Sequence, residues 1–409
     1  MSLRQDALAI AAAAIRAADP YDTTCAALRR YLPWDRSFTV FSIGKAAIPM
    51  ARAAADTLGG RIRQGLAVTK YGHTGDFSSP FFQVIEAAHP VSDENSLRAA
   101  ETALRMAAAL GEDDMAVVLL SGGGSALFEK SLIPPEAQRE LTEKLLARGA
   151  AIGEINAARR RVSAVKGGKF AAACYPAKVV TFALSDVLSN DKSVIASGIT
   201  VADETPDAFV RAVADKYLYD MDKSILDCLY ITHNARINDG GYHFVGDINL
   251  LCEAAKARAQ ALGYTAEIVS RSLTGEARDR AREITANVPD RPGKCAYLYG
   301  GETTVTLKGR GLGGRNQEMA LAAAIALEGR EGIAFCSVGS DGTDGPTDAA
   351  GGFADGAACA AMRAAGVSPE EALANNDSYR ALQAANNLIV TGPTGTNVND
   401  ITIILTTSP

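Results

Sequence analysis

The sequence has 409 residues, which exceeds the size of one ordinary domain, so we expect two. Hydrophobic residues make up 47% of the chain and charged residues 22%, a composition typical of a folded globular protein and not of a disordered one. The formal net charge is −6 and no block of basic residues occurs, which disfavours nucleic acid or an anionic membrane as the main partner.

The N-terminus is rich in alanine but lacks a basic leader region, so it predicts an amphipathic first helix. No apolar run has the length of a membrane span. The seven cysteines are scattered and never stand in CxxC spacing, and the four histidines are isolated, which argues against a zinc site. We therefore expect a cytoplasmic protein with reduced thiols and no membrane partner.

The N-terminal half alternates short apolar runs with helical segments. The predicted strands are Phe38–Ile43, Gly65–Lys70, Gln83–Ala88, Val117–Leu120 and Lys178–Leu184. The predicted helices are Ala46–Leu58, Ser96–Leu110, one that begins at Pro134-Pro135, and most of Asp203–Ile231. This alternation predicts a doubly wound parallel sheet of the α/β class.

A polar, turn-rich stretch, His233–Gly241, is the candidate domain boundary, which gives expected domains of residues 1–232 and 233–409. A second, smaller α/β pattern follows it. Its predicted helices are Asn249–Leu262, Leu273–Ala286 and Gln317–Ala326. Its predicted strands are Thr265–Val269, Cys295–Tyr299, Thr303–Leu307, Ile333–Ser337, Leu388–Thr391 and Ile401–Leu405.

A glycine loop directly follows the apolar run Val117–Leu120. It consists of Ser121, Gly122, Gly123, Gly124 and Ser125, whose small side chains let the backbone turn tightly and direct N–H groups at an anion. A flexible connection that binds nothing is an equally good interpretation of the loop alone. The GxxxxGK[ST] spacing is absent, so an ordinary P-loop nucleotidase is disfavoured.

Two further loops carry cations. Gly44 and Lys45 follow a predicted strand, where an ammonium could lie over a phosphate or a carboxylate. Lys166, Gly167 and Gly168 follow a basic helix, and Arg159 lies seven residues before Lys166 on the same helical face. Solvated surface charges are the competing interpretation of both.

The stretch Gly309–Gly314 contains a GxGxxG match between a predicted strand and a predicted helix. A lone match is a weak signal for a dinucleotide, because the acidic residue expected on the next strand is missing. Arg315 is more informative, since a guanidinium at a helix N-terminus suits a carboxylate or a phosphoryl group. A structural arginine that caps a nearby carbonyl is the alternative.

Four carboxylates near strand ends are candidates to hold Mg²⁺ or to orient a hydroxyl nucleophile: Asp186, Glu302, Asp341 and Asp344. Each could instead serve only in an Asx turn. Taken together, cations, glycine loops and carboxylates are what phosphoryl transfer requires. A nicotinamide-dependent oxidoreductase that uses the GxGxxG loop and a non-catalytic nucleotide or metabolite sensor remain alternatives.

The chain resembles the class II glycerate 2-kinases, whose C-terminal half is the MOFRL domain. The resemblance runs nearly the whole length and rests on IGKAA (43–47), LLSGGGSAL (119–127), VSAVKGGK (162–169), LSDV (184–187), GGETTV (300–305), GGRNQEMAL (313–321), SDGTDGPTDAAGG (340–352) and TGPTGTNVND (391–400). The chain departs from the pattern at Ile199, where proline is expected, and at Arg161, where histidine is expected.

This resemblance implies ATP-dependent phosphorylation of D-glycerate to 2-phosphoglycerate with Mg²⁺, in a cleft between a Rossmann-like domain and a smaller α/β domain. It implies that Lys45 and Arg315 hold glycerate and support catalysis. In the kinase hypothesis, Asp186 is a further catalytic candidate, and Asp186, Asp341 or Asp344 would bind Mg²⁺. Asn316 and Thr347 lie within the matching motifs and join the expected binding residues. The expected partners are glycerate and ATP, and homo-oligomerisation is left open. Some members of this family carry the name hydroxypyruvate reductase.

Overall fold

The computed structural model describes residues 2–231 and 236–408. The chain forms two compact units. One unit, which we call the parallel-sheet unit, comprises Pro20–Leu184 and Asn190–Val245. The other, the mixed-sheet unit, comprises the residues up to Asp19, Ser185–Ser189 and the chain from Gly246 onward. None of the described helices is long and apolar enough to cross a bilayer.

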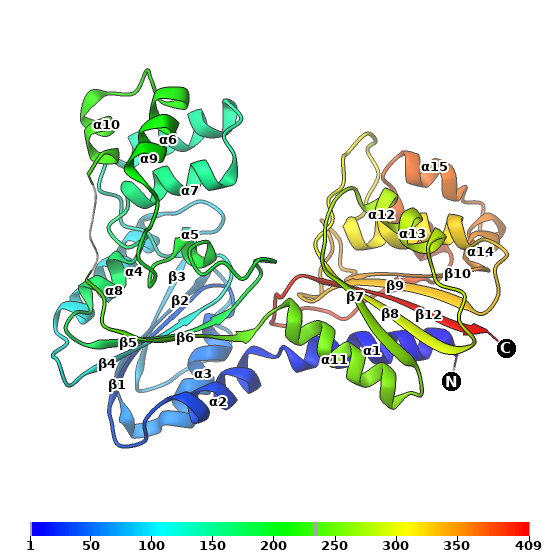
Figure 1. The fold of residues 1–409 in the computed structure, drawn as a ribbon, viewed down its shortest axis with the longest axis horizontal. Coiled ribbons are helices and arrows are strands. Elements are labelled where there is room, and N and C mark those ends of the chain that lie inside the picture. Colours follow the sequence, from blue (N-terminus) through cyan, green and yellow to red (C-terminus); the bar gives the residue numbers. More distant parts are fainter. Residues whose placement is uncertain (1, 232–235, 409) are drawn as a thin grey trace. The chain divides into compact units, whose positions relative to one another are not determined.

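The parallel-sheet unit is built on six strands in the order β3-β2-β1-β4-β5-β6 (Figure 1). Their bounds are β1 Phe38–Ile43, β2 Ile62–Lys70, β3 Phe82–Ala87, β4 Met115–Leu120, β5 Lys178–Leu184 and β6 Asp239–Gly246. The strands from β1 to β5 pair in parallel. Strands β1 and β4 are buried throughout, as their unbroken apolar runs predict. The expected doubly wound, Rossmann-like sheet is confirmed.

Helices cover both faces of this sheet (Figure 1). On one face lie α2 Pro20–Tyr31 and α3 Ala47–Leu58, and on the other lie α4 Glu94–Ala108, α5 Gly124–Leu127 and α8 Lys169–Ala173. A separate helical cluster with its own apolar core is formed by α6 Pro135–Ala147, α7 Ile152–Arg161, α9 Asp207–Tyr217 and α10 Lys223–Leu229. Two short 3₁₀ turns complete the unit, η1 Gly59–Arg61 and η2 Ile195–Ser197.

The mixed-sheet unit has six strands in the order β11-β10-β9-β12-β8-β7. Their bounds are β7 Thr265–Leu273, β8 Gly293–Gly301, β9 Ile333–Gly339, β10 Gly351–Asp355, β11 Leu388–Ile389 and β12 Asp400–Ser408. Strands β7 and β8 are parallel, and the remaining pairs are antiparallel. The last strand, β12, lies in the middle of the sheet, so the chain's C-terminal segment completes the core.

Helices α1 Leu3–Ala17 and α11 Ile248–Ala261 cover one face of the mixed sheet (Figure 1). The other face carries α12 Ala277–Ala286, α13 Arg315–Leu327, α14 Ala358–Ala364, α15 Pro369–Ala374 and α16 Ser378–Ala384. Buried Asp6 accepts a 2.8 Å hydrogen bond from the hydroxyl group of Tyr264, which ties α1 to this unit. The first helix is therefore amphipathic as expected, but it belongs to a different unit from the one that follows it.

Several expected boundaries differ from the structure. The expected division between residues 232 and 233 lies outside the described residues, and the mixed-sheet unit resumes at Gly246. The predicted helix at Leu273 is wrong at its start, because Leu273 still belongs to β7 and α12 begins at Ala277. The predicted strand Thr303–Leu307 is wrong: β8 already has β7 and β12 on its two sides, so this segment forms only a bridge from Thr304 to Glu276.

Candidate functional site

The glycine loop lies at the point where the strand order of the parallel sheet reverses. Strand β1 leads to β2 on one side and to β4 on the other, and ligands of open α/β sheets bind outside the carboxyl ends of strands at such a switch point. Gly44 and Lys45 follow β1 there, and Ser121 to Ser125 follow β4. The structure thus brings together two loops that we had singled out independently.

Backbone contacts lock these two loops against each other. The Lys45 N–H donates to the Gly122 carbonyl at 2.9 Å, and the Ala46 N–H donates to the Ser121 hydroxyl at 3.0 Å. A Cβ atom at Gly44 would lie 2.2 Å from the Ser121 Oγ, so only glycine permits this approach. Gly44 also has a φ of +130°, which other residues rarely adopt.

The loop presents unused donors. Within the described residues, neither the N–H of Gly122 nor the N–H of Gly123 has a hydrogen-bond acceptor. The Lys45 side chain is exposed and forms no ion pair with a described residue. Free backbone N–H groups beside an ammonium group form a concave cationic surface that suits an anion such as a phosphate.

A strained turn supports the loop from behind. Ala196 and Ser197 both have left-handed φ values, +48° and +56°, which cost free energy for residues other than glycine and tend to occur at functional sites. The Ser197 hydroxyl lies 2.8 Å from that of Ser125, and a Cβ at Gly124 would lie 2.9 Å from the Ala196 Cβ. The strained turn therefore fixes the glycine loop by close packing.

The lysine-glycine turn serves the structure instead of offering free cations. The N–H groups of Gly167 and Gly168 donate to the carbonyls of Ser197 and Gly198, at 3.1 and 2.7 Å. Lys166 is fully buried and pairs with the buried Glu129, which also accepts a 2.7 Å hydrogen bond from Ser163. The N–H groups of Gly167 and Gly168 are therefore occupied, and the charge of Lys166 is paired inside the protein. A role of these residues in phosphate binding stays a prediction.

Two arginines of the basic helix before this turn differ in their contacts. Arg161, one of the two departures from the family pattern, is buried and pairs with Asp207 at 2.8 Å. Arg159 has no hydrogen bond or ion pair within the described part of the chain, although burial lowers its pKa. Arg159 therefore remains available to an anion.

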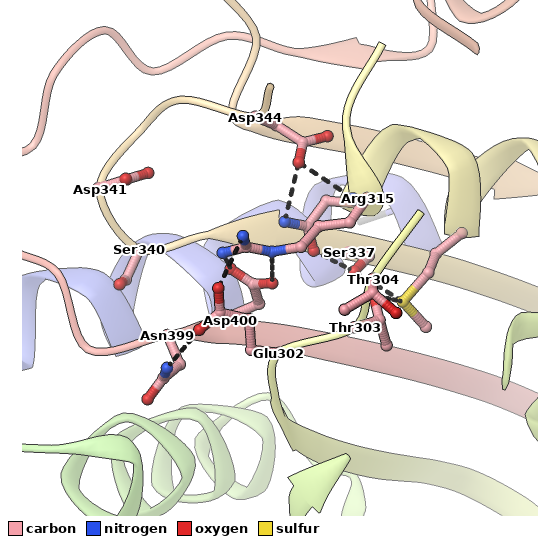
Figure 2. A network of polar contacts seen from close by, with 12 residues as sticks. Glu302, Thr303, Thr304, Arg315, Ser337, Ser340, Asp341, Asp344, Asn399 and Asp400 are labelled. Carbon is pink, nitrogen blue, oxygen red and sulfur yellow. Dashed lines mark hydrogen bonds and ion pairs between the residues drawn. The ribbon is translucent and has the colours of Figure 1, made fainter. Parts of the chain in front are cut away.

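In the mixed-sheet unit, Arg315 is the first residue of α13 and is held by two carboxylates (Figure 2). Its Nε and Nη2 donate to the two carboxylate oxygens of Asp400 at 2.5 and 2.9 Å, and its Nη1 lies 2.9 Å from Glu302. The Arg315 side chain keeps 33% of its surface exposed, whereas that of Asp400 keeps 8%. Asp400 and Glu302 thus fix the orientation of the guanidinium, and part of the Arg315 side chain stays open to solvent.

Burial shapes the electrostatics of this cluster. Burial, together with the negative charges of Asp344 and Glu302, raises the pKa of Asp400 to about 6, although the contact with Arg315 acts to lower it. Burial alone would lower the pKa of Arg315, but the contact with Asp400 raises it above its usual value. Arg315 therefore stays protonated at any physiological pH and provides a permanent positive charge.

Asp344 caps α13, as Figure 2 shows. Its carboxylate accepts hydrogen bonds from the N–H groups of Asn316 and Gln317, at 3.1 and 2.8 Å. The Thr347 hydroxyl in turn accepts a 2.8 Å bond from the Gln317 side chain. Asn316 is buried and accepts a 2.6 Å bond from Ser337. These residues hold the N-terminus of the helix, and so position Arg315 instead of facing a ligand themselves.

Asn399 joins three segments at the rim of this cluster. Its Nδ2 donates to Glu302 at 3.0 Å and to the backbone carbonyl of Asp186 at 2.8 Å, and its own carbonyl accepts the N–H of Ser340 at 3.0 Å. Asn399 has a φ of +67°. Asn399 therefore contacts Asp186 through its side-chain amide and the turn that carries Asp341 through its backbone carbonyl.

A metal site made of protein groups alone is not formed. Within residues 2–231 and 236–408, no three His, Cys, Asp or Glu side chains gather closely enough to hold an ion. Asp344 is engaged by amide donors, while Asp341 is half-buried and accepts a bond from the Thr343 N–H at 3.0 Å.

The GxGxxG loop is used internally. The N–H groups of Gly309, Arg310 and Leu312 donate to the side chains of Asn376, Asn375 and Asp377, at 3.0, 3.1 and 2.9 Å. Cβ atoms at Gly309 and Gly311 would lie 2.2 and 2.5 Å from the backbone of this same segment. The glycines allow close packing, and the N–H groups from Gly309 to Leu312 are occupied inside the protein.

Sequence reasoning missed three residues near the two clusters. Asp400 and Asn399 lie at the start of β12, and we assigned them no role although they belong to a quoted motif. His89 follows β3, and we assigned it no role either. A search for polar residues directly at strand ends would have found Asp400 and His89.

Comparison with known proteins agrees with this architecture. Residues 6–230 match the family model "Domain of unknown function (DUF4147)", and residues 295–400 match the MOFRL family. A D-glycerate 2-kinase of Thermotoga maritima is 46% identical over 88% of this chain and 89% of its own. A relative from Agrobacterium vitis with a hydroxypyruvate reductase name is 39% identical over 90% of this chain and 98% of its own.

The fold is also found in a solved structure. The crystal structure of a glycerate kinase from Thermotoga maritima superimposes with a TM-score of 0.95, at 42% identity, over 99% of both chains. The match covers both sheets, so neither unit is an addition peculiar to this sequence. The chain belongs to the glycerate kinase family that combines a DUF4147 domain with a MOFRL domain.

Proposed function

We propose that this protein transfers the γ-phosphoryl group of ATP to the 2-hydroxyl of D-glycerate, giving 2-phosphoglycerate and ADP. Kinases of this family require a nucleotide co-substrate, and the names of the relatives point to glycerate as the acceptor. The observation that carries the proposal is the contrast between two glycine loops. Within the described residues, the loop after β4 keeps the N–H groups of Gly122 and Gly123 free, whereas in the GxGxxG loop the four successive N–H groups from Gly309 to Leu312 are occupied by acceptors from residues 375–377.

In this proposal the glycine loop and Lys45 bind phosphate oxygens. Phosphoryl transfer spreads negative charge over the equatorial oxygens of the moving group, and fixed donors stabilise that charge without reorganising. Arg315 offers its outer edge to a second anionic group, the glycerate carboxylate or the moving phosphoryl group. Ser121, Ser125 and Gly124 shape the loop, and Arg159 is a further candidate contact for the nucleotide.

We assign Mg²⁺ to the nucleotide phosphates, with Asp341 and Asp186 as the protein ligands. Mg²⁺ in kinases usually takes one or two carboxylates, and the phosphates and water supply the other ligands. When bound, such an ion neutralises charge on the phosphates. We also propose a cytoplasmic location, supported by the seven free thiols of the chain.

Product analysis tests the reaction directly. The purified protein is incubated with MgATP and D-glycerate, and ³¹P NMR distinguishes a phosphate on C2 from one on C3. We expect 2-phosphoglycerate and ADP in equal amounts. The appearance of 3-phosphoglycerate, or ATP hydrolysis without an acceptor product, would contradict the proposed reaction.

A lysine variant tests the site. Lys45→Met is expected to lower kcat by about 10²- to 10³-fold, because one preorganised charge is lost. The matched control is Lys223→Met, which removes an exposed lysine at the first turn of α10. Equal activities of the two variants would remove Lys45 from the site.

The oxidoreductase alternative is tested with hydroxypyruvate and NADH or NADPH. Because the N–H donors of Gly309 to Leu312 are occupied, we expect no enzyme-dependent loss of nicotinamide absorbance. Rapid oxidation of the reduced cofactor would favour the reductase over the kinase.

A further inference from the structure

His89 lies beside the glycine loop, although it comes from a different strand. It follows β3 at the carboxyl end of the parallel sheet, where Lys45 follows β1. Gly123 lies against both side chains: a Cβ atom there would be 3.1 Å from His89 Cδ2, 3.3 Å from His89 Nε2 and 3.2 Å from Lys45 Cγ. The Cδ2–Nε2 edge of the imidazole therefore faces the loop whose donors are free.

The turn that carries His89 is fixed in place. The Ser92 hydroxyl donates to the Ala126 carbonyl at 2.8 Å, which joins the turn to the segment after the glycine loop. Asp93 caps α4 by accepting the Ser96 N–H at 2.9 Å. His89 is therefore held near the loop by contacts on its C-terminal side, and not by hydrogen bonds of its own ring.

The imidazole is chemically available. Within the described residues, no hydrogen bond or ion pair engages the side chain of His89. Burial lowers its pKa, and the charges of Lys45 and Lys70, at the ends of β1 and β2, lower it further. The glycine loop itself contains no titratable side chain. The ring is thus neutral at pH 7 and has a nitrogen lone pair.

A base is what the described anion site otherwise lacks. The transfer of a phosphoryl group to an alcohol releases the hydroxyl proton, and a positioned group must accept it. Lys45 and Lys70 are cations and cannot accept a proton. His89 is the neutral acceptor beside them, and imidazole has a pKa close to the working pH, which general-base catalysis requires.

We propose that His89 is the general base that accepts the hydroxyl proton of the acceptor. This inference rests on the proposed glycerate kinase reaction. The acceptor oxygen forms a bond to the γ-phosphorus, and the bond from that phosphorus to the bridging oxygen breaks, with its electron pair leaving on the nucleoside diphosphate. The hydroxyl proton passes to a ring nitrogen of His89, which becomes an imidazolium.

The test compares His89→Gln with the wild type. Glutamine places an amide near the position of Nε2, so it preserves a hydrogen bond but cannot take a proton. We expect kcat to fall by about 10²- to 10⁴-fold while the KM values for D-glycerate and MgATP change by less than about threefold. The control is His73→Gln, which alters an exposed histidine in the turn after β2 and should leave both parameters unchanged.

The pH profile separates a base from a structural role. If His89 accepts the proton, its ionisation contributes one unit to the limiting slope of the acid limb of the wild-type kcat/KM profile. His89→Gln should therefore reduce that slope by one. Circular dichroism and thermal unfolding identify a variant that has lost its fold, and in that case His89→Asn is measured in the same way.

Two results would overturn this role for His89. They are a wild-type kcat in a folded glutamine variant, whether or not KM rises, and an acid limb whose limiting slope the substitution leaves unchanged. A wild-type protein that forms no 2-phosphoglycerate would instead refute the proposed function, so the two failures are distinguishable.

Discussion

The guanidinium of Arg315 donates to both carboxylate oxygens of Asp400, from Nε at 2.5 Å and from Nη2 at 2.9 Å. This paired contact consumes one edge of the guanidinium and fixes its plane. Nη1 lies 2.9 Å from the partly exposed carboxylate of Glu302, and the exposed remainder of the guanidinium faces solvent without a loss of side-chain freedom on binding. An arginine held in this way is a preorganised anion contact.

Replacement of Arg315 by lysine is therefore not conservative. Lysine keeps the charge but cannot form two parallel hydrogen bonds with Asp400, so the charge is no longer fixed in place. We expect Arg315→Lys to lower kcat by about 10²- to 10³-fold in the glycerate kinase assay. Arg310→Ala, which removes an exposed arginine from the preceding loop, is the control and should leave kcat unchanged. A lysine variant as active as the control would mean that Arg315 only supports the fold.

The raised pKa of Asp400 has a measurable effect on stability. Its pKa is about 6 in the folded protein and near 3.8 when the chain is unfolded, so the folded state binds this proton more tightly. The stabilisation from that proton is complete below pH 4 and is lost as the pH rises through 6. In the wild type, relative to Asp400→Asn, the free energy of unfolding should fall by about 3 kcal/mol from pH 4 to 7. Urea denaturation across this range measures the difference. A difference that rises with pH would mean that Arg315 outweighs burial and lowers the pKa.

The parallel sheet could be predicted from sequence because its signal is local. Strands Phe38–Ile43 and Lys178–Leu184 were predicted with their observed bounds, since each is an apolar run that ends at polar or glycine residues. Strand β10, which begins with Gly351 and Gly352, was not predicted. Those glycines are needed within a strand: a Cβ at Gly351 would lie 1.9 Å from the Ser337 carbonyl oxygen.

The site could be predicted only in part, because the sequence shows which residues are charged but not which of them form ion pairs or hydrogen bonds inside the folded protein. Lys45 and Arg315 were singled out, and both are accessible. Lys166 looked equally cationic, but its partner Glu129 lies 37 positions earlier and no local pattern connects them. Likewise, the acceptors that occupy the GxGxxG loop come from residues 375–377, well over fifty positions later.

Asn376 is the residue that commits the GxGxxG loop to a structural role. Its Oδ1 accepts the N–H groups of Lys308 and Gly309, and its Nδ2 donates to the buried Glu318 at 2.9 Å. Asn376→Ala should lower the free energy of unfolding by about 2–4 kcal/mol, because several buried polar groups lose their partner. The control is Asn386→Ala, which has nearly the same φ, +55° against +54°, but an exposed side chain. The control should lose only about 1 kcal/mol, the cost of a left-handed alanine. Equal losses in denaturant titrations would mean that the loop does not depend on Asn376.

Alanine substitutions at Gly123 and Gly72 distinguish two effects: the free-energy cost of a left-handed alanine, and the effect of a methyl group placed against His89 and Lys45. Its φ is +85°, and a Cβ atom there would approach both His89 and Lys45 to just over 3 Å. Gly72 has a similar φ, +76°, but a Cβ atom at that position meets nothing within 4 Å. Gly72→Ala should therefore show only the backbone cost of about 1 kcal/mol and full activity.

Gly123→Ala should show the same backbone cost, and in addition it should displace the two side chains from the loop. A methyl group there also covers the free N–H of Gly123. We expect kcat to fall at least about tenfold, since small displacements of positioned groups are costly in phosphoryl transfer. Calorimetric titration with MgADP should show weaker binding in this variant than in Gly72→Ala. A Gly123→Ala protein that binds MgADP normally and turns over at the wild-type rate would mean that the phosphates do not contact this loop.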